Sequence, residues 1–126
     1  MYRIIIAGSR GFEDYECLKK HVEECLTSAP DRLQGKEIVI VSGAAHGTDA
    51  LGERYAAEKG YKVERFPADW RKHGIRAGVI RNKEMAEIAD ALIPFWDGKS
   101  KGTANMIEVA TRKKLHIFPV CYFRNR

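Results

Sequence analysis

The stretch VSGAAHGTDAL, residues 41–51, decides the fold of this chain. The apolar, β-branched run Glu37–Val41 leads into it and predicts a buried strand. Residues 48–59 follow with helical spacing and end at Gly60, which predicts a helix. The loop between them has two glycines and a helix start, a combination that favours an anion such as phosphate. The alternative is a turn that uses glycine only for its backbone angles.

Two further glycine loops occupy the same position between a strand and a helix. GSRGF, residues 8–12, follows the apolar strand Tyr2–Ala7 and precedes a predicted helix over Tyr15–Thr27. DGKSKGT, residues 97–103, follows the strand Ala91–Trp96 and opens a predicted helix over Thr103–Lys113. Three loops of this kind are a more specific signal for a ligand site than any one of them.

The remaining pattern alternates in the same way. We expect strands over residues 61–66 and 116–120 and a helix over residues 79–90, with an irregular, basic segment over residues 71–78 as a candidate binding loop. The order predicts an α/β fold: a single Rossmann-like three-layer domain over residues 1–126, with a parallel five-stranded sheet and helices on both faces. The glycine loops then share the carboxyl edge of the sheet, where such folds bind ligands.

Composition narrows the class of protein. The chain has 126 residues, no apolar run long enough to span a membrane and no secretory leader pattern. Its three cysteines are an odd number without CxxC spacing, which argues against a disulfide framework or a metal site. We therefore expect a cytoplasmic protein with no bound metal and no membrane partner.

The net charge of +5 raises the question of nucleic acid. The basic residues are dispersed along the chain in short groups, the last being Arg124–Arg126, and form no continuous stripe with aromatic residues. This favours a solvated basic surface with a cationic ligand pocket. We expect any binding of nucleic acid to be weak.

Several motifs resemble one superfamily. SGAAHGTD, residues 42–49, resembles the Ser-Gly-x-Ala-x-Gly-x-Asp element of the DprA/Smf family, and Gly8–Arg10 resembles its first loop. RNKEM, residues 81–85, together with Gly102-Thr103, resembles the LOG phosphoribohydrolases. Both families belong to the Rossmann-like SLOG superfamily. FPADW, residues 66–70, and GTANM, residues 102–106, make the chain most similar to its YspA-like branch, which implies a nucleotide or nucleotide-derived ligand at the strand ends.

The resemblance and the loops together give a set of expected ligand-binding residues. Arg10 and Arg81 would balance the charge of a phosphate, Asp69 or Trp70 would contact a base or ribose, and Arg81 would make few packing contacts in a solvated pocket. The full set is Gly8, Ser9, Arg10, Ser42, Gly43, Gly47, Thr48, Asp69, Trp70, Arg81, Asn82, Gly102 and Thr103.

Three functions follow as hypotheses. The first is a sensor or binding module for a nucleotide, with no further cofactor specified. The second is a phosphoribohydrolase-like enzyme that cleaves an N-glycosidic bond, with Arg81 and one of the carboxylates Asp49, Asp69 and Glu84 as catalytic candidates. The third is DprA-like binding of single-stranded DNA. The sequence leaves open the ligand and the formation of a homo-oligomer.

Two departures from the LOG pattern argue against the enzyme hypothesis. LOG enzymes pair their arginine with a glutamate three residues after the Gly-Thr pair, and this chain has Met106 there. Asp97-Gly98 also replaces the Pro-Gly-Gly of that family. Glu108 lies about 200° further round the helix and is a poor substitute.

Overall fold

The computed structural model describes residues 1–124, so the last two residues of the basic group Arg124–Arg126 lie outside the described part. Its strands form one sheet in the order β3-β2-β1-β4-β5, with β6 also paired to β4, and every pairing is parallel. The strands are β1 (Tyr2–Gly8), β2 (Ile38–Ser42), β3 (Lys62–Arg65), β4 (Ala91–Trp96), β5 (His116–Ile117) and β6 (Cys121–Tyr122).

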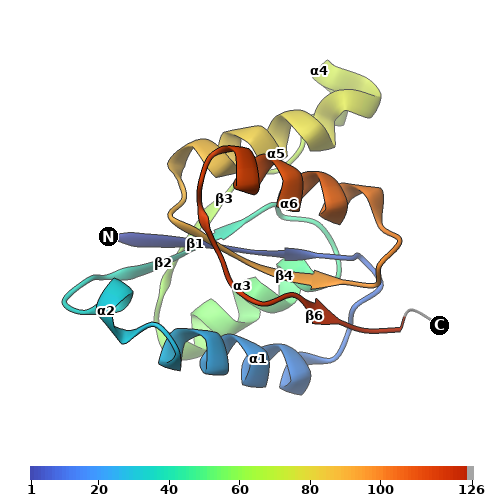
Figure 1. Ribbon diagram of the computed structural model, residues 1–126. Helices are drawn as coiled ribbons and strands as arrows, with labels where there is room; N and C mark the ends of the chain where they lie inside the picture. Colours follow the sequence, from blue (N-terminus) through green and yellow to red (C-terminus); the bar gives the residue numbers. More distant parts are fainter. Residues whose placement is uncertain (125–126) are drawn as a thin grey trace.

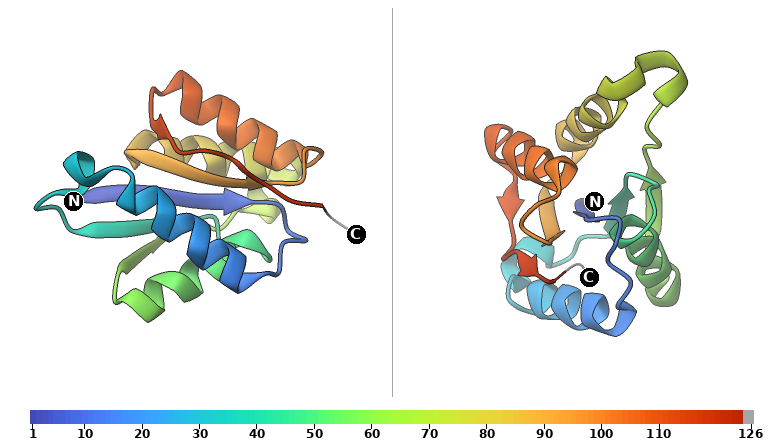
Figure 2. Two further views of the ribbon diagram at one scale, coloured as in Figure 1. Left: turned by 60° about the horizontal axis from the view of Figure 1, so that its bottom comes forward. Right: turned by 90° about the vertical axis from the view of Figure 1, so that its right-hand side faces the viewer.

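Helices cover both faces of the sheet, as the sequence predicts. α1 (Tyr15–Thr27) and α3 (Thr48–Lys59) lie on one face, and α5 (Ala77–Ile88) and α6 (Lys101–Arg112) lie on the other (Figures 1 and 2). The period-two alternation of β1 builds both cores: Ile4 and Ile6 pack toward α1 and α3, whereas Ile5 packs toward α5 and α6. None of the helices within residues 1–124 is long and apolar enough to span a membrane.

The sheet has six strands rather than the five predicted. The strand expected over residues 116–120 is limited to β5, and a further short strand, β6, forms just beyond the expected range. Leu92 and Trp96 accept backbone hydrogen bonds from Phe118 and Phe123 on the side of β5 and β6. Pro94 lies two residues from both Leu92 and Trp96, so its backbone nitrogen points to the same side of β4. Because proline has no N–H, it cannot donate a hydrogen bond there, and it faces the gap between β5 and β6. The edge of the sheet is therefore built from two short strands.

The basic segment over residues 71–78 is more regular than predicted. It forms the short helix α4 (Trp70–His73), a 3₁₀ turn η1 (Gly74–Arg76) and the start of α5. The Asp69 carboxylate caps α4 by accepting a hydrogen bond from the Lys72 backbone N–H at 3.0 Å. α4 projects beyond the body of the domain, near the carboxyl ends of the strands (Figure 1). The polar connection before β2 also contains a short helix, α2 (Pro30–Leu33).

Candidate functional site

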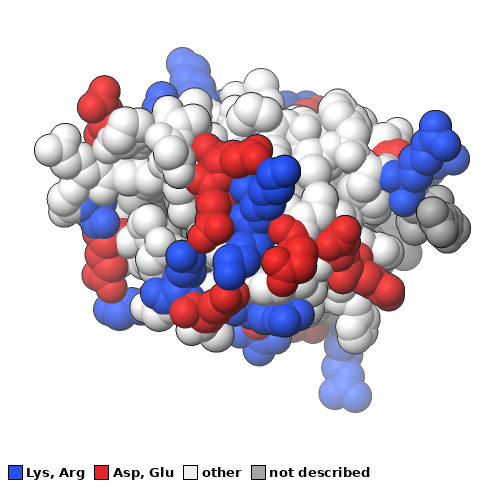
Figure 3. Space-filling view, turned by 90° about the horizontal axis from the view of Figure 1, so that it is seen from below, with Lys and Arg blue, Asp and Glu red and all other residues white. Residues whose placement is uncertain are grey.

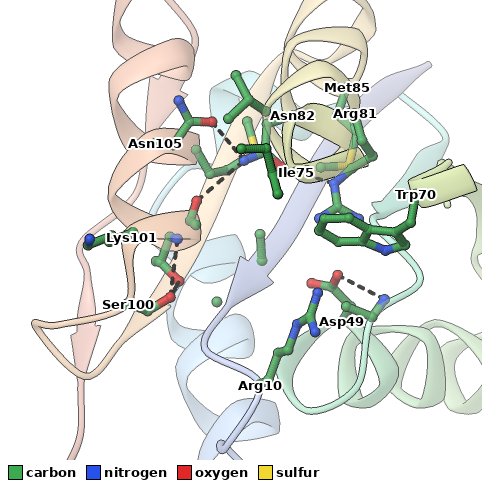
Figure 4. Close-up of a pocket in the computed structure, with 18 residues that line it drawn as sticks. Arg10, Asp49, Trp70, Ile75, Arg81, Asn82, Met85, Ser100, Lys101 and Asn105 are labelled. Carbon is green, nitrogen blue, oxygen red and sulfur yellow. Dashed lines mark hydrogen bonds between the residues drawn. The ribbon is translucent and has the colours of Figure 1, made fainter. Parts of the chain in front are cut away.

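A cavity of about 270 Å³ opens at the carboxyl edge of the sheet, between the end of β1 and the first turns of α3, α5 and α6 (Figure 4). It brings together residues that the sequence predicts to contact a ligand. These are Gly8, Arg10, Trp70, Arg81, Asn82, Gly102 and Thr103, together with the catalytic candidate Asp49.

The charged residues that line this cavity are mostly basic. Among the described residues that line it, Arg10, Arg81 and Lys101 are basic and Asp49 is the acidic one. In Figure 4, Arg81 enters from α5 and Arg10 from the loop after β1, with Asp49 between them. The guanidinium of Arg10 lies over the half-exposed indole of Trp70, 5.8 Å from the ring centroid. The cavity therefore favours an anionic ligand with a planar or apolar part.

Asp49 is a buried carboxylate, only 6% exposed, in the first turn of α3. It accepts a hydrogen bond from the Ala45 backbone N–H at 3.2 Å. Burial raises the pKa of Asp49 to about 6, although this hydrogen bond and the charge of Arg81 oppose the shift. Near neutral pH the group can hold or release a proton at little cost.

Arg81 is anchored rather than free in solvent, which corrects the expectation of few contacts. Its Nη1 donates to the Gly43 carbonyl, and its Nε donates to Asn82 Oδ1 at 3.0 Å. Burial lowers the pKa of Arg81, whereas the charge of Asp49 raises it. The guanidinium is thus held in place before any ligand arrives.

Asn82 fixes the distance between the two helices that wall the cavity. Its Nδ2 donates to Asn105 Oδ1 at 2.9 Å and to the Gly102 carbonyl at 3.3 Å, both on α6. Sequence reasoning did not select Asn105 as a site residue, although its spacing of three from Gly102 places it on the same helix face.

Further residues line the cavity that the sequence did not single out as ligand contacts. Lys101 lies next to the glycine of the third loop, a signal that was available. Most of the apolar ones come from α5, α6 and η1, and helical periodicity alone does not separate a cavity wall from a core position. The set is Ala7, Ala45, Ile75, Gly78, Val79, Met85, Ser100, Lys101, Asn105 and Met106.

Three backbone amides of the loop after β2 are already used inside the protein. The Ala44 N–H donates to Ser42 Oγ at 3.1 Å, the Ala45 N–H to Asp49, and the Thr48 N–H to the Ser9 carbonyl. The Asp49 carboxylate, in the first turn of α3, is thus itself an anion bound by this loop. A bound phosphate would instead depend on the basic side chains.

Three predicted ligand residues support the loops and do not line the cavity. Ser9, Ser42 and Thr48 are 3%, 1% and 0% exposed. The Thr48 hydroxyl donates to the Ser9 carbonyl at 3.0 Å, and the Ser42 hydroxyl donates to Glu53 at 2.6 Å. These polar side chains satisfy buried backbone and carboxylate groups, so they hold the loop shape.

Three other candidates also lie outside this cavity. A Cβ on Gly47 would come within 2.2 Å of the Arg10 carbonyl oxygen, so this glycine lets two loops cross. Asp69 is exposed and caps α4, and Glu84 is exposed on α5. Met106 is buried in the cavity wall, whereas Glu108 is exposed and paired with Arg112. Of the three candidate carboxylates, the cavity contains Asp49.

A second cavity of about 350 Å³ adjoins the first. Its lining includes Gly43, the remaining predicted ligand residue, and it shares Arg10, Ala45, Trp70 and Arg81 with the first cavity. The loop Gly43–His46 and the turn Pro67–Ala68 form the rest.

The face formed by α1 and α3 carries mixed charge. Lys19 pairs with Glu58 at 2.8 Å, and Lys59 pairs with Glu23 at 3.0 Å. Figure 3 shows basic and acidic side chains interspersed over this face. It lacks the continuous positive potential with which proteins track a nucleic-acid backbone.

Cys17, Cys25 and Cys121 are free thiols. Within residues 1–124, no three His, Cys, Asp or Glu side chains lie close enough together to hold a metal ion.

Comparisons with known proteins agree with the fold. The model of the YspA, cpYpsA-related SLOG family (YAcAr) matches residues 2–73. The Gene 61 protein of Mycobacterium phage D29 is 35% identical over 118 residues, which cover 89% of this chain and 90% of that protein. The structure of DNA processing protein A (DprA) from Streptococcus pneumoniae matches with a TM-score of 0.68 at 19% identity. That match covers 94% of this chain and 50% of the DprA chain, so this chain spans half the length of that protein.

Proposed function

The chain belongs to the YspA, cpYpsA-related SLOG family, and from this premise we propose that it binds a nucleotide or nucleotide-derived molecule in the cavity at the carboxyl edge of its sheet. The observation that carries the proposal is the cluster of Arg10, Arg81 and Lys101 around a cavity with one carboxylate and an exposed indole. A phosphate satisfies the cations, and a base can stack on the indole.

The anchoring of Arg81 supports this assignment. A guanidinium that is already hydrogen-bonded to Gly43 and Asn82 loses little side-chain entropy when a ligand binds. Each charge-assisted hydrogen bond from such a group contributes about 1.5–3 kcal/mol. Two of them are enough for micromolar affinity when stacking and apolar contacts add to them.

Isothermal titration calorimetry with nucleoside monophosphates, diphosphates and the unphosphorylated nucleosides tests the proposal. The phosphorylated ligands should bind, and the nucleosides should bind at least about tenfold more weakly. Mass spectrometry of molecules that co-purify with the native protein identifies the natural ligand.

Gly102 offers a blocking variant. Gly102 lines the cavity, and a Cβ at this position meets no atom within 4 Å, so there is room to add a side chain there. Gly102→Leu should therefore abolish nucleotide binding while the protein stays folded. Ala57→Leu, at an exposed position of α3 outside both cavities, is the matched control. Equal affinity in Gly102→Leu and the control would contradict the site.

Asp49 favours a second candidate function, hydrolysis of the N-glycosidic bond of a nucleoside monophosphate. In this reaction water adds to the anomeric carbon, the bond to the base breaks, and the base leaves with a proton. A buried carboxyl whose pKa is about 6 can supply or accept that proton near neutral pH. Release of free base, measured by liquid chromatography and lost in Asp49→Asn while binding persists, would favour the enzyme over the sensor.

A further inference from the structure

The two cavities meet at one set of side chains. Arg10, Ala45, Trp70 and Arg81 line both of them, so the cavities meet at these residues, which include the Arg10–Trp70 pair. Neither of these two side chains is locked in place by burial, since Arg10 is exposed and Trp70 is half exposed.

Positive charge is concentrated at this junction. The two guanidinium groups belong to both cavities, while the far wall of the second cavity is made of small or neutral residues such as Ala44, Pro67 and Ala68. A ligand whose phosphate contacts these guanidinium groups would therefore have room for an organic group in either cavity.

Gly43, which lines the second cavity, lies where a side chain would not fit. A Cβ on Gly43 would lie 2.6 Å from Arg81 Nη1 and 2.7 Å from Asp49 Oδ2, so a side chain at Gly43 would displace the groups that define the junction. Ala44, which follows Gly43 and also lines the second cavity, adopts a left-handed conformation with φ 59°. The second cavity, at about 350 Å³, is no smaller than the first at about 270 Å³.

We infer that the two cavities form one bipartite site for a dinucleotide-type ligand, in which two nucleoside-sized groups are joined through phosphates that contact Arg10 and Arg81 where the two cavities meet. The first cavity takes one group, and the cavity lined by Gly43–His46 and Pro67–Ala68 takes the other. This inference rests on the proposed function, because it assumes a nucleotide in the first cavity.

The test compares ADP with diadenosine diphosphate, which differ by one adenosine at the same pair of phosphates. Calorimetry gives the ratio of their dissociation constants. The wild-type protein should bind diadenosine diphosphate at least about tenfold more tightly than ADP. Ala68→Trp, which fills the second cavity, should bring the ratio close to one. Ala57→Trp, on the exposed surface of α3, should leave it at the wild-type value.

The outcomes separate the two proposals. A wild-type ratio near one, with ADP still bound, overturns the bipartite site and leaves the proposed function standing. A tenfold ratio that persists in Ala68→Trp places the second adenosine elsewhere and also overturns it. Binding of neither ligand counts against the proposed function itself. Ala68→Leu gives the same comparison if the tryptophan variant does not fold.

Discussion

Asp49 and Arg81 meet across Gly43, at a position where no side chain fits between them. A Cβ on Gly43 would come within 2.7 Å of Asp49 Oδ2 and within 2.6 Å of Arg81 Nη1. Both side chains are further tied to the same loop, Arg81 through the Gly43 carbonyl and Asp49 through the Ala45 N–H. The loop after β2 therefore sets the positions of the Asp49 carboxylate and the Arg81 guanidinium together.

Gly43→Ala should disturb this arrangement directly. The added methyl group pushes the ends of Arg81 and Asp49 aside, and such overpacking costs about 1–3 kcal/mol of the free energy of unfolding. Nucleotide affinity should fall at least about tenfold, because the guanidinium leaves its anchored position. Urea denaturation and calorimetry measure the two effects. Wild-type affinity in this variant would show that the position of Arg81 is unimportant for binding.

Arg81→Ala should weaken nucleotide binding by about one to two orders of magnitude, because a charge-assisted hydrogen bond is lost. Arg81→Lys should recover only part of the affinity, since an ammonium keeps the charge but not the planar donor pair. Stability should also fall, by about 1–2 kcal/mol, because Gly43 and Asn82 lose a donor. Arg76→Ala, at an exposed position outside both cavities, removes the same charge and is the control for calorimetry.

The free energy of unfolding should depend on pH through the titration of Asp49. Its pKa is about 6 in the folded chain and about 3.9 in an unfolded one, so the folded state binds the proton more tightly. This contribution to stability is fully present below about pH 4 and is lost as the pH rises through about 6. The total change is on the order of 3 kcal/mol.

Comparison with Asp49→Asn isolates that contribution. Between about pH 4 and about pH 7.5, the wild-type protein should lose stability relative to the variant, as measured by denaturation at each pH. Glu84→Gln, at an exposed site on α5, removes one carboxylate outside the cavity and serves as the control. A difference between wild type and Asp49→Asn that stays constant with pH would contradict the buried, protonatable state.

Binding of single-stranded DNA, measured by fluorescence anisotropy, should be weak and sequence-independent. Basic and acidic side chains alternate on the face of α1 and α3, so only dispersed lysines and arginines act through counterion release. The affinity should fall steeply between about 50 and about 200 mM salt. Sequence-selective binding that survives the higher salt concentration would favour the nucleic-acid hypothesis over the nucleotide sensor.

The fold could be predicted from local pattern because each signal depends on neighbouring residues. The continuous apolar run in Tyr2–Ala7 predicts a buried strand, and the helical spacing of Thr48–Lys59 predicts a helix. The glycine loop between a strand and a helix marks where each element ends. Parallel order and right-handed connections then bring the loops to one edge. The break between β5 and β6 opposite Pro94 was not predicted. It depends on which backbone groups of β4 face that edge of the sheet, and this is known only once the strands are paired.

What the sequence by itself determined was the class of fold and the edge at which charged and glycine-rich loops gather. Tertiary structure alone decided which of those residues face the cavity. Ser42 and Thr48 have the residue types of ligand contacts, yet their hydroxyls are used inside the protein. Arg81 reaches the Gly43 carbonyl across 38 positions of sequence. Contacts of that kind depend on side-chain direction and helix placement, which packing sets and local pattern does not encode.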